Sequence, residues 1–290
     1  MKELFTMWKD PRMVALTAVI AAVYMTALIP FKGFVIVPGF TEIRPANVLP
    51  VALSLMFGPA TAWGAGIGNL FSDAFGGTLT AGSIFGFVGN FFSGFIGYKL
   101  WGRLGWFSSG EKPTMRSVKQ LGEFVVISFV AAAGTAAIIA WGLELLGLFP
   151  FSVFATIISV NDFLAAAVIG PPLLYLLYPR IERAGLLYTG MMDDSDRPNT
   201  ATRDQRYAAV GLSTVSVAWL LVGIGIGVAV QGVPFGVGGA GIEAGTGGSV
   251  VQITIGAIAF SLLVGFSILS GGWSPRLRRS TGRERIGRSG

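Results

Sequence analysis

Long apolar runs, separated by short turns that contain Gly, Pro or charged residues, constrain this chain more than any other feature. Four of these runs, 13–29, 46–57, 207–230 and 250–269, contain no Asp, Glu, Lys or Arg. A helix needs about 20 apolar residues to cross a hydrocarbon core of about 30 Å. Because 52% of the residues are hydrophobic and 12% are charged, most of the chain needs lipid as its solvent. We therefore expect a multi-pass protein of the cell membrane.

Hydropathy and turn residues together predict eight membrane spans. The fold class expected is all-α: a polytopic membrane helix bundle with a six-helix core and two additional C-terminal transmembrane helices. Pro171 and Pro172 should kink or end the sixth span, and the Pro- and Gly-containing stretch 31–45 should form an ordered outer loop. The expected spans are 13–29, 46–57, 60–75, 81–100, 121–146, 155–178, 207–230 and 250–269.

The polar stretches divide the chain into three parts. Residues 1–180 are expected to form the six-helix membrane core, beginning with a short polar leader. Residues 181–206 carry Asp193, Asp194 and Asp196 among basic residues without an apolar face, which indicates a mobile cytoplasmic linker. Residues 207–290 are expected to form the additional transmembrane helix pair with a basic cytoplasmic tail.

The distribution of Lys and Arg predicts the orientation in the membrane. Nineteen of the 21 Lys and Arg residues fall on one side if the spans are grouped four, two and two, which leaves Lys32 and Arg44 on the other side. Basic loops are retained in the cytoplasm, so both termini are expected to be cytoplasmic. The basic tail then lies near anionic membrane lipid, and we expect no nucleic-acid partner.

Several polar residues are predicted to lie at the middle or outer half of the spans. Ionisable groups in membrane segments are costly and usually face a cavity or one another, so their common depth predicts a substrate-binding pocket open to the outside. Asn69 and Asp73 are four residues apart and share one helix face. The predicted pocket residues are Arg44, Asn47, Asn69, Asp73, Asn90, Asn161 and Asp162.

Structural interpretations of the same residues stay open. Arg44 with Glu42 or Asp73 would also fit an ion pair at the interface, and the Asn residues would also fit interhelical hydrogen bonds. Glu123 and Glu144, near the ends of the fifth span, are expected to reach the lipid headgroups. The Gly residues at 64, 68, 82, 86, 89 and 97 and Ser93 predict close packing of the third and fourth spans.

The residue types that are absent exclude most enzyme chemistries. The chain has no Cys and no His, which removes thiolate nucleophiles, imidazole bases and the usual zinc, haem or copper ligands. It also lacks a G-x-x-x-x-G-K-S/T phosphate-binding loop, so the common route of ATP hydrolysis is missing. We expect no catalytic residues, no metal site and no cofactor.

The sequence IRPANVLPVALSLMFGPATAWGAGIGNLFSDAFGG, followed by TLTAGSIFGFVGNFFSGFIGYKLWG, resembles a known family. It is similar to the substrate-binding S component of energy-coupling factor (ECF) transporters, most of all to the branch associated with uptake of queuosine precursors. The resemblance covers about residues 13–178. It implies a six-helix module that binds a small nutrient from outside, in a pocket closed by the loop between its first two helices.

The same resemblance implies partners. An S component docks on a coupling membrane subunit that carries two ATPase subunits, so ATP hydrolysis would be performed by the partners and this chain would not be an enzyme. The family's Ala-x-x-x-Ala docking pattern matches Ala18 and Ala22. The helix pair after residue 207 is not part of the usual module, and it could be a lipid-facing appendage, an oligomerisation element or a partner contact.

Three functional hypotheses follow from the sequence. The leading one is a substrate-capture component of an ATP-driven importer for a vitamin-like or nucleobase-like micronutrient. The alternative is a self-sufficient secondary carrier or channel for a small polar solute. The third is a structural or interaction membrane protein that recruits partners through its linker and tail.

Overall fold

Helices make up nearly all of the computed structural model, which describes residues 2–37, 41–42, 44–192, 203–229 and 245–271. The α-helices are α1 (Lys2–Thr6), α2 (Pro11–Leu28), α3 (Val48–Phe57), α4 (Pro59–Phe75), α5 (Gly82–Leu100), α6 (Val118–Leu145), α7 (Phe151–Arg183), α8 (Tyr188–Met191), α9 (Arg203–Ala229) and α10 (Val250–Leu269). Short 3-10 helices are η1 (Met7–Lys9), η2 (Ile29–Gly33), η3 (Pro45–Asn47) and η4 (Gly105–Phe107). The predicted helix bundle is confirmed, and each of the eight expected spans corresponds to one described α-helix.

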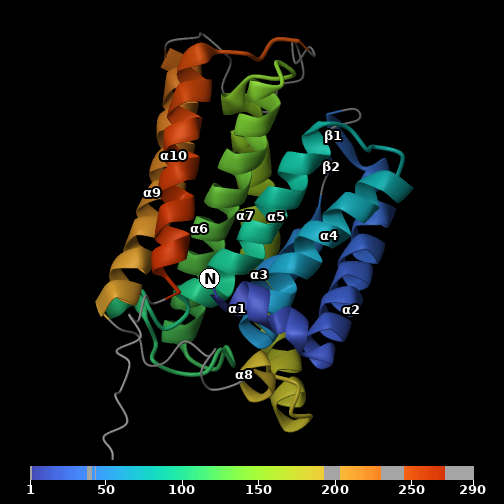
Figure 1. Cartoon of the computed structure of the whole chain (residues 1–290), viewed down its shortest axis with the longest axis vertical. Coiled ribbons are helices and arrows are strands. Elements are labelled where there is room, and N and C mark those ends of the chain that lie inside the picture. The colour runs from blue at the N-terminus through green and yellow to red at the C-terminus, as the bar shows by residue number, and fades with distance from the viewer. Residues whose placement is uncertain (1, 38–40, 43, 193–202, 230–244, 272–290) are drawn as a thin grey trace, which may run out of the picture.

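The predicted loop between the first two spans contains a small antiparallel hairpin. Its strands are β1 (Val35–Val37) and β2 (Thr41–Glu42), which pair in the register Val35 with Glu42 and Val37 with Thr41. The hairpin lies between η2 and η3, beside the ends of α2 and α4 (Figure 1). The chain enters α3 through η3, whose first residue is Pro45. Residues 38–40 and 43 of the predicted outer loop lie outside the described residues.

Local sequence signals explain where several helices begin. Asp10 accepts a hydrogen bond from the Arg12 backbone N–H at 2.8 Å, and Pro11 occupies the first turn of α2. Ser117 and Gln120 form a capping box at the start of α6. Gly58 has a φ of 50° between α3 and α4, a conformation that glycine adopts without strain.

Five helical stretches of the described residues are long and apolar enough to cross a membrane: Pro11–Gly33, Val118–Leu145, Phe151–Met191, Arg203–Ala229 and Val250–Leu269. The shorter helix α3 lies between these elements and has nine of its ten residues buried. The length and apolar composition of these five stretches are those of a multi-pass membrane protein.

Several boundaries differ from the sequence-based prediction. The predicted leader is helical, and its Leu4 and Met7 side chains are buried. Helix α7 continues through Pro171 and Pro172 to Arg183, so these prolines do not end it. Of the expected linker, residues 181–192 contain the end of α7 and helix α8, residues 203–206 belong to α9, and residues 193–202 lie outside the described residues.

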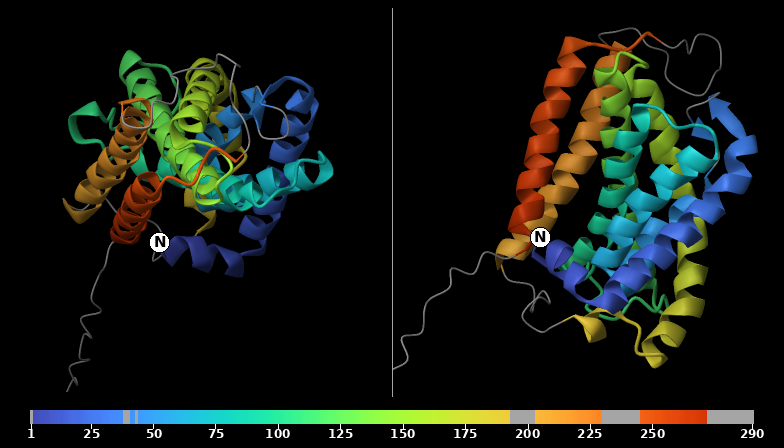
Figure 2. Two further views of the ribbon diagram at one scale, coloured as in Figure 1. Left: turned by 90° about the horizontal axis from the view of Figure 1, so that it is seen from above. Right: turned by 45° about the vertical axis from the view of Figure 1, so that its right-hand side comes forward.

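The helices pack as a core with one helix pair at its side. Helix α2 contacts α4, α4 contacts α5, α5 contacts α6, and α6 contacts α7, while α3 contacts both α5 and α7. Helices α9 and α10 pair with each other and contact α6 on the side of the bundle away from α2 (Figures 1 and 2). The added pair therefore leaves the outer face of α2 uncovered.

Buried contacts join this added pair to the core. The Trp141 indole of α6 donates to the Ile253 carbonyl at 3.1 Å and lies where a Cβ on Gly256 would collide with it. The Gln252 side chain donates to the Gly223 carbonyl at 2.7 Å and is 1% exposed. Helices α9 and α10 are thus packed into the fold rather than attached only by the linker.

The start of the chain and the end of α10 lie at one end of the bundle. Lys99 of α5 forms an ion pair with Glu3 and donates to the Ser270 carbonyl at 3.4 Å. An even number of crossings would place both termini on one side of a membrane, in agreement with the predicted orientation. Their cytoplasmic location stays a prediction from the loop charges, and residues 272–290 of the tail lie outside the described residues.

Two expectations about individual residues are wrong. Glu123 and Glu144 do not reach outward, because each is 1% exposed and accepts hydrogen bonds inside the protein. Gly64 and Gly68 do not pack against α5; a Cβ on either residue would meet Ile20 or Ala21 of α2. The small residues on α4 therefore let α2 pack closely against α4.

Candidate substrate-binding cavity

A polar cavity lies at the end of the bundle opposite to the chain start. Its volume is about 50 Å³. It is enclosed by η3, the second half of α4, the first half of α5, and parts of α6 and α7. All seven predicted pocket residues line it, namely Arg44, Asn47, Asn69, Asp73, Asn90, Asn161 and Asp162. The structure thus brings together residues that lie up to 118 positions apart in the chain.

A buried hydrogen-bond network forms the inner wall of the cavity. The Tyr24 hydroxyl of α2 lies 2.7 Å from Oδ1 of Asn47 and 2.7 Å from Oδ1 of Asn90. The Asn47 amide donates in turn to Oδ1 of Asp162, and the Asn90 amide donates to the Gly86 carbonyl at 2.9 Å. Four separate segments are therefore tied at one depth, and Tyr24 is fully buried between them.

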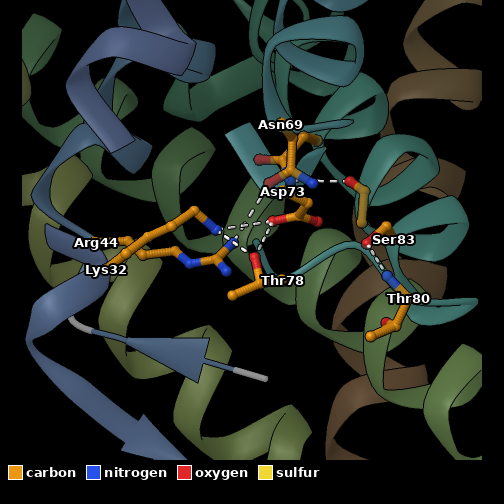
Figure 3. A network of polar contacts seen from close by, with 9 residues as sticks. Lys32, Arg44, Asn69, Asp73, Thr78, Thr80 and Ser83 are labelled. Atoms are coloured by element: carbon orange, nitrogen blue, oxygen red, sulfur yellow. Dashed lines mark hydrogen bonds and ion pairs between the residues drawn. The ribbon is translucent and has the colours of Figure 1, made fainter. Parts of the chain in front are cut away.

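Two cations approach the cavity from the loop that follows α2 (Figure 3). Lys32 Nζ lies 3.1 Å from Oδ1 of Asp73 and 2.6 Å from Oγ1 of Thr78. The Arg44 guanidinium donates to Oδ1 of Asn69 at 3.3 Å, and the Arg44 backbone N–H donates to Oδ1 of Asn161 at 3.3 Å. These contacts close the outer side of the cavity with side chains from the loop.

The carboxylate of Asp73 is paired with Lys32, which the sequence-based prediction did not include. Lys32 reaches Asp73 across Gly76, where a Cβ would collide with the Lys32 side chain. The sequence contained one signal for this pair. Lys32 and Arg44 are the two basic residues that are not on the same predicted side of the membrane as the other 19. Tyr24 was also missed, although it is the one residue of the first span that combines an aromatic ring with a hydroxyl.

An apolar wall faces the polar one. Ile139 and Leu143 of α6 and Phe154 and Ile158 of α7 line this side of the cavity. On the polar side, the Asn69 side chain packs directly against Gly86, where a Cβ would lie only 2.7 Å from the Asn69 amide nitrogen. A cavity with one apolar side and convergent polar groups on the other is typical of small-molecule sites.

Trp63 does not line the cavity. Its indole donates to the Leu4 carbonyl at 2.9 Å, and its ring packs edge to face against Trp8. Trp63 therefore holds the chain start against α4, at the end of the bundle opposite to the cavity. Phe154 is the aromatic side chain that lines the polar cavity.

The size and chemistry of the cavity define what it can hold. One water molecule needs about 10–15 Å³ measured in the same way, so the cavity holds a few waters as it stands. A larger solute requires side chains at the outer side to move. Among the residues that the structure describes, no group of three or more His, Cys, Asp or Glu side chains could hold a metal ion.

The predicted docking residues Ala18 and Ala22 lie on the outer face of α2. Both are exposed, and both line a groove of about 350 Å³ between α2 and α4. Large apolar side chains border this groove, including Phe71, which is 49% exposed, and Phe75, which is 75% exposed. The groove is therefore separate from the polar cavity and open to a neighbouring helix or to lipid.

Comparison with known protein families bears on this arrangement. A model of the QueT transporter family matches residues 14–179, which is more than half of the chain and includes every residue of the predicted pocket. The chain belongs to the QueT transporter family. The matched part begins in α2 and ends within α7, so α9 and α10 lie outside it.

No curated protein matches the chain, and no solved structure matches it. The family match and the apolar helices together identify a multi-pass membrane transporter for a small substrate. They also agree with the resemblance to the queuosine-precursor branch of ECF S components.

Proposed function

We propose that this QueT family member is the substrate-capture (S) component of an ATP-driven ECF-type importer. It takes a vitamin-like or nucleobase-like micronutrient from outside and delivers it through partner subunits, with no catalytic activity of its own. The observation that carries the proposal is the convergence of seven polar residues from four segments on one cavity. That cavity lies at the end of the bundle predicted to face outward.

The chemistry of the cavity supports a ligand with many hydrogen-bonding groups. Each Asn amide offers both donors and an acceptor, and the carboxylates of Asp73 and Asp162 accept from an amine or a ring N–H. The Arg44 guanidinium suits a carbonyl or anionic group. The apolar wall with Phe154 suits the face of a flat ring. A nucleobase-like heterocycle combines these features, and nanomolar capture corresponds to about 12 kcal/mol.

The proposed partners are a coupling membrane subunit and two ATPase subunits. The chain has no phosphate-binding loop for ATP, so the energy for uptake would come from other chains. The exposed Ala18 and Ala22 offer a surface of small side chains on which a partner helix can approach closely. The separation of this face from the cavity lets docking and ligand binding be tested independently.

The experiment that tests the proposal is native mass spectrometry of the protein gently extracted from its own membranes. We expect a complex that contains a second membrane protein and two ATPase subunits, with a small molecule retained on this chain. A chain that retains a small molecule without partners and moves it across liposomes would support the secondary carrier instead. A chain that retains nothing would overturn the capture function.

Two sets of variants separate the cavity from the docking face. The double variant Arg44→Ala/Asp73→Ala should lose the small molecule and keep the partners. The variant Ala22→Leu should do the opposite, because a larger side chain blocks close approach on α2 and touches no residue of the cavity. If the double variant retained its ligand, the assignment of this cavity would be wrong.

A further inference from the structure

A second and larger cavity lies at the other end of the bundle. Its volume is about 390 Å³, and it is enclosed by the ends of α3 and α5, the loop before α6, helix α7 and helix α8. Leu55, Tyr98, Arg103, Tyr178 and Tyr188 are among the residues that line it. A volume of this size is within the range of about 300–1,000 Å³ found for small-molecule sites. This cavity shares no lining residue with the proposed nutrient site.

The notable group in its wall is the guanidinium of Arg103. Arg103 is 9% exposed, and its Nη1 donates to the Lys99 carbonyl at 2.8 Å. Within the described parts of the chain, the structure records no carboxylate within ion-pair distance of Arg103. A guanidinium carries five N–H donors, so most of the donors of Arg103 lack a protein acceptor.

The other charged groups around this cavity have partners. Lys112 forms an ion pair with Glu182 at 2.6 Å, and Lys99 forms one with Glu3. Glu111, which also lines the cavity, accepts a hydrogen bond from the Gln120 amide at 2.8 Å. The donors of Arg103 that lack a protein acceptor can therefore bind an anion that enters the cavity.

We propose that this cavity binds a phosphate group, carried either by an anionic phospholipid headgroup or by a soluble phosphate compound. The fork of a guanidinium matches the oxygens of a phosphate. Tyrosine side chains, which place a ring in apolar surroundings and a hydroxyl at a polar boundary, form much of the wall. Basic pockets between transmembrane helices at the cytoplasmic side suit anionic headgroups. The proposal does not depend on the nutrient-capture function.

The test uses the full-length protein, purified in detergent and depleted of lipid. Phosphatidylglycerol, phosphatidylcholine or inorganic phosphate is then added, and native mass spectrometry and thermal unfolding report binding. We expect phosphatidylglycerol or inorganic phosphate to bind and to raise the unfolding temperature, and the probe that does so identifies the source of the phosphate. If neither probe binds, the proposal is overturned.

The variant Arg103→Gln should weaken this binding about tenfold or more, because it removes a charged donor from the wall of the cavity. Arg180→Gln is the matched control, since Arg180 also donates to the carbonyl four residues earlier but is exposed and does not line the cavity. Equal losses in the two variants would show a nonspecific effect of surface charge and would overturn the site.

A second variant works in the opposite direction and does not depend on how well Arg103→Gln folds. Glu111→Gln removes a negative charge from the same wall while its shape is kept. We expect it to tighten binding of the phosphate-bearing probe severalfold, which misfolding cannot imitate. Unchanged or weaker binding in Glu111→Gln would place the probe outside this cavity.

Discussion

Two regions of this protein bury carboxylates in different ways. At the ends of α6, Glu123 accepts hydrogen bonds from the backbone N–H groups of Gly102 and Ser109, each at 2.7 Å, and from the Ser109 hydroxyl at 2.7 Å. In the polar cavity, Asp73 and Asp162 are bonded mainly to side chains, those of Lys32, Thr78 and Asn47. The first arrangement holds loops to a helix, whereas the second surrounds an open space.

The opposite end of α6 follows the first pattern. Glu144 accepts from the backbone N–H groups of Phe151 and Ser249, and so it joins the start of α7 to the start of α10. Backbone donors cannot leave without moving the chain, but side-chain donors can turn to another rotamer. Burial of a carboxylate therefore does not identify a binding site by itself. A binding site is identified by the type of donors that the carboxylate contacts and by an open space beside it.

The largest effect on ligand binding is expected in the cavity. Asp162→Asn preserves an acceptor for the Asn47 amide but removes the negative charge. We expect retention of the co-purified small molecule to fall roughly 10- to 100-fold, as for the loss of a charged hydrogen bond. Native mass spectrometry measures retention, and thermal unfolding should show a nearly unchanged protein. A normal ligand load would remove Asp162 from the proposed site.

The converse variant is Glu123→Ala at the end of α6. Three donors lose their acceptor, so we expect the protein to be destabilised by about 4 kcal/mol. Thermal unfolding in detergent should show this loss, while the folded fraction keeps its small molecule. Glu182→Ala is the control, because its exposed pair with Lys112 should contribute about 0–1 kcal/mol. Equal stability of the two variants would contradict the structural role of Glu123.

The buried ion pair of Glu3 and Lys99 contains a further carboxylate that we expect to stabilise the fold, and its contribution can be measured through its pH dependence. Burial, the largest single cause, raises the pKa of Glu3, but the Lys99 ammonium, the N-terminal charge and the hydrogen bonds to the carboxylate together outweigh burial, and the pKa falls to about 2. The ionised carboxylate therefore adds stability that is complete above its unfolded pKa of 4.5 and is lost as the pH falls towards 2. Glu3→Gln should cost about 3 kcal/mol at pH 7.

Unfolding measured at several pH values checks this prediction. The difference between the wild-type protein and Glu3→Gln should shrink as the pH is lowered from about 4.5. A difference that stayed constant over this range would show that packing of α1, rather than its charge, carries the effect.

The smallest effect on stability is expected for Lys32→Met. The pair of Lys32 and Asp73 is 11% exposed on each side, and Asp73 borders the polar cavity, where water can solvate its carboxylate when Lys32 is removed. Its removal should change the free energy of unfolding by less than about 1 kcal/mol. Thermal unfolding beside Glu3→Gln provides the measurement, and a loss as large as that of Glu3→Gln would mean that Lys32 is a fixed structural partner.

The sequence by itself predicted the eight long helices and seven of the side chains that line the polar cavity. Long apolar runs are unfavourable in water and therefore form membrane helices. Polar side chains within them must contact one another or line a cavity, so their depth along the helices predicted where they meet. The same argument was wrong for Glu123 and Glu144, because a position near a span end does not reveal that a loop folds back to donate its backbone N–H groups.

Only the tertiary structure decided which partners meet. It paired Asp73 with Lys32 while Arg44 contacts Asn69, placed Tyr24 between Asn47 and Asn90, and packed Gly64 and Gly68 of α4 against α2. It also carried α7 through two prolines and set the added helix pair on the side away from α2. These outcomes depend on the rotation and spacing of whole helices, which follow from side-chain packing over the entire bundle and not from any local pattern.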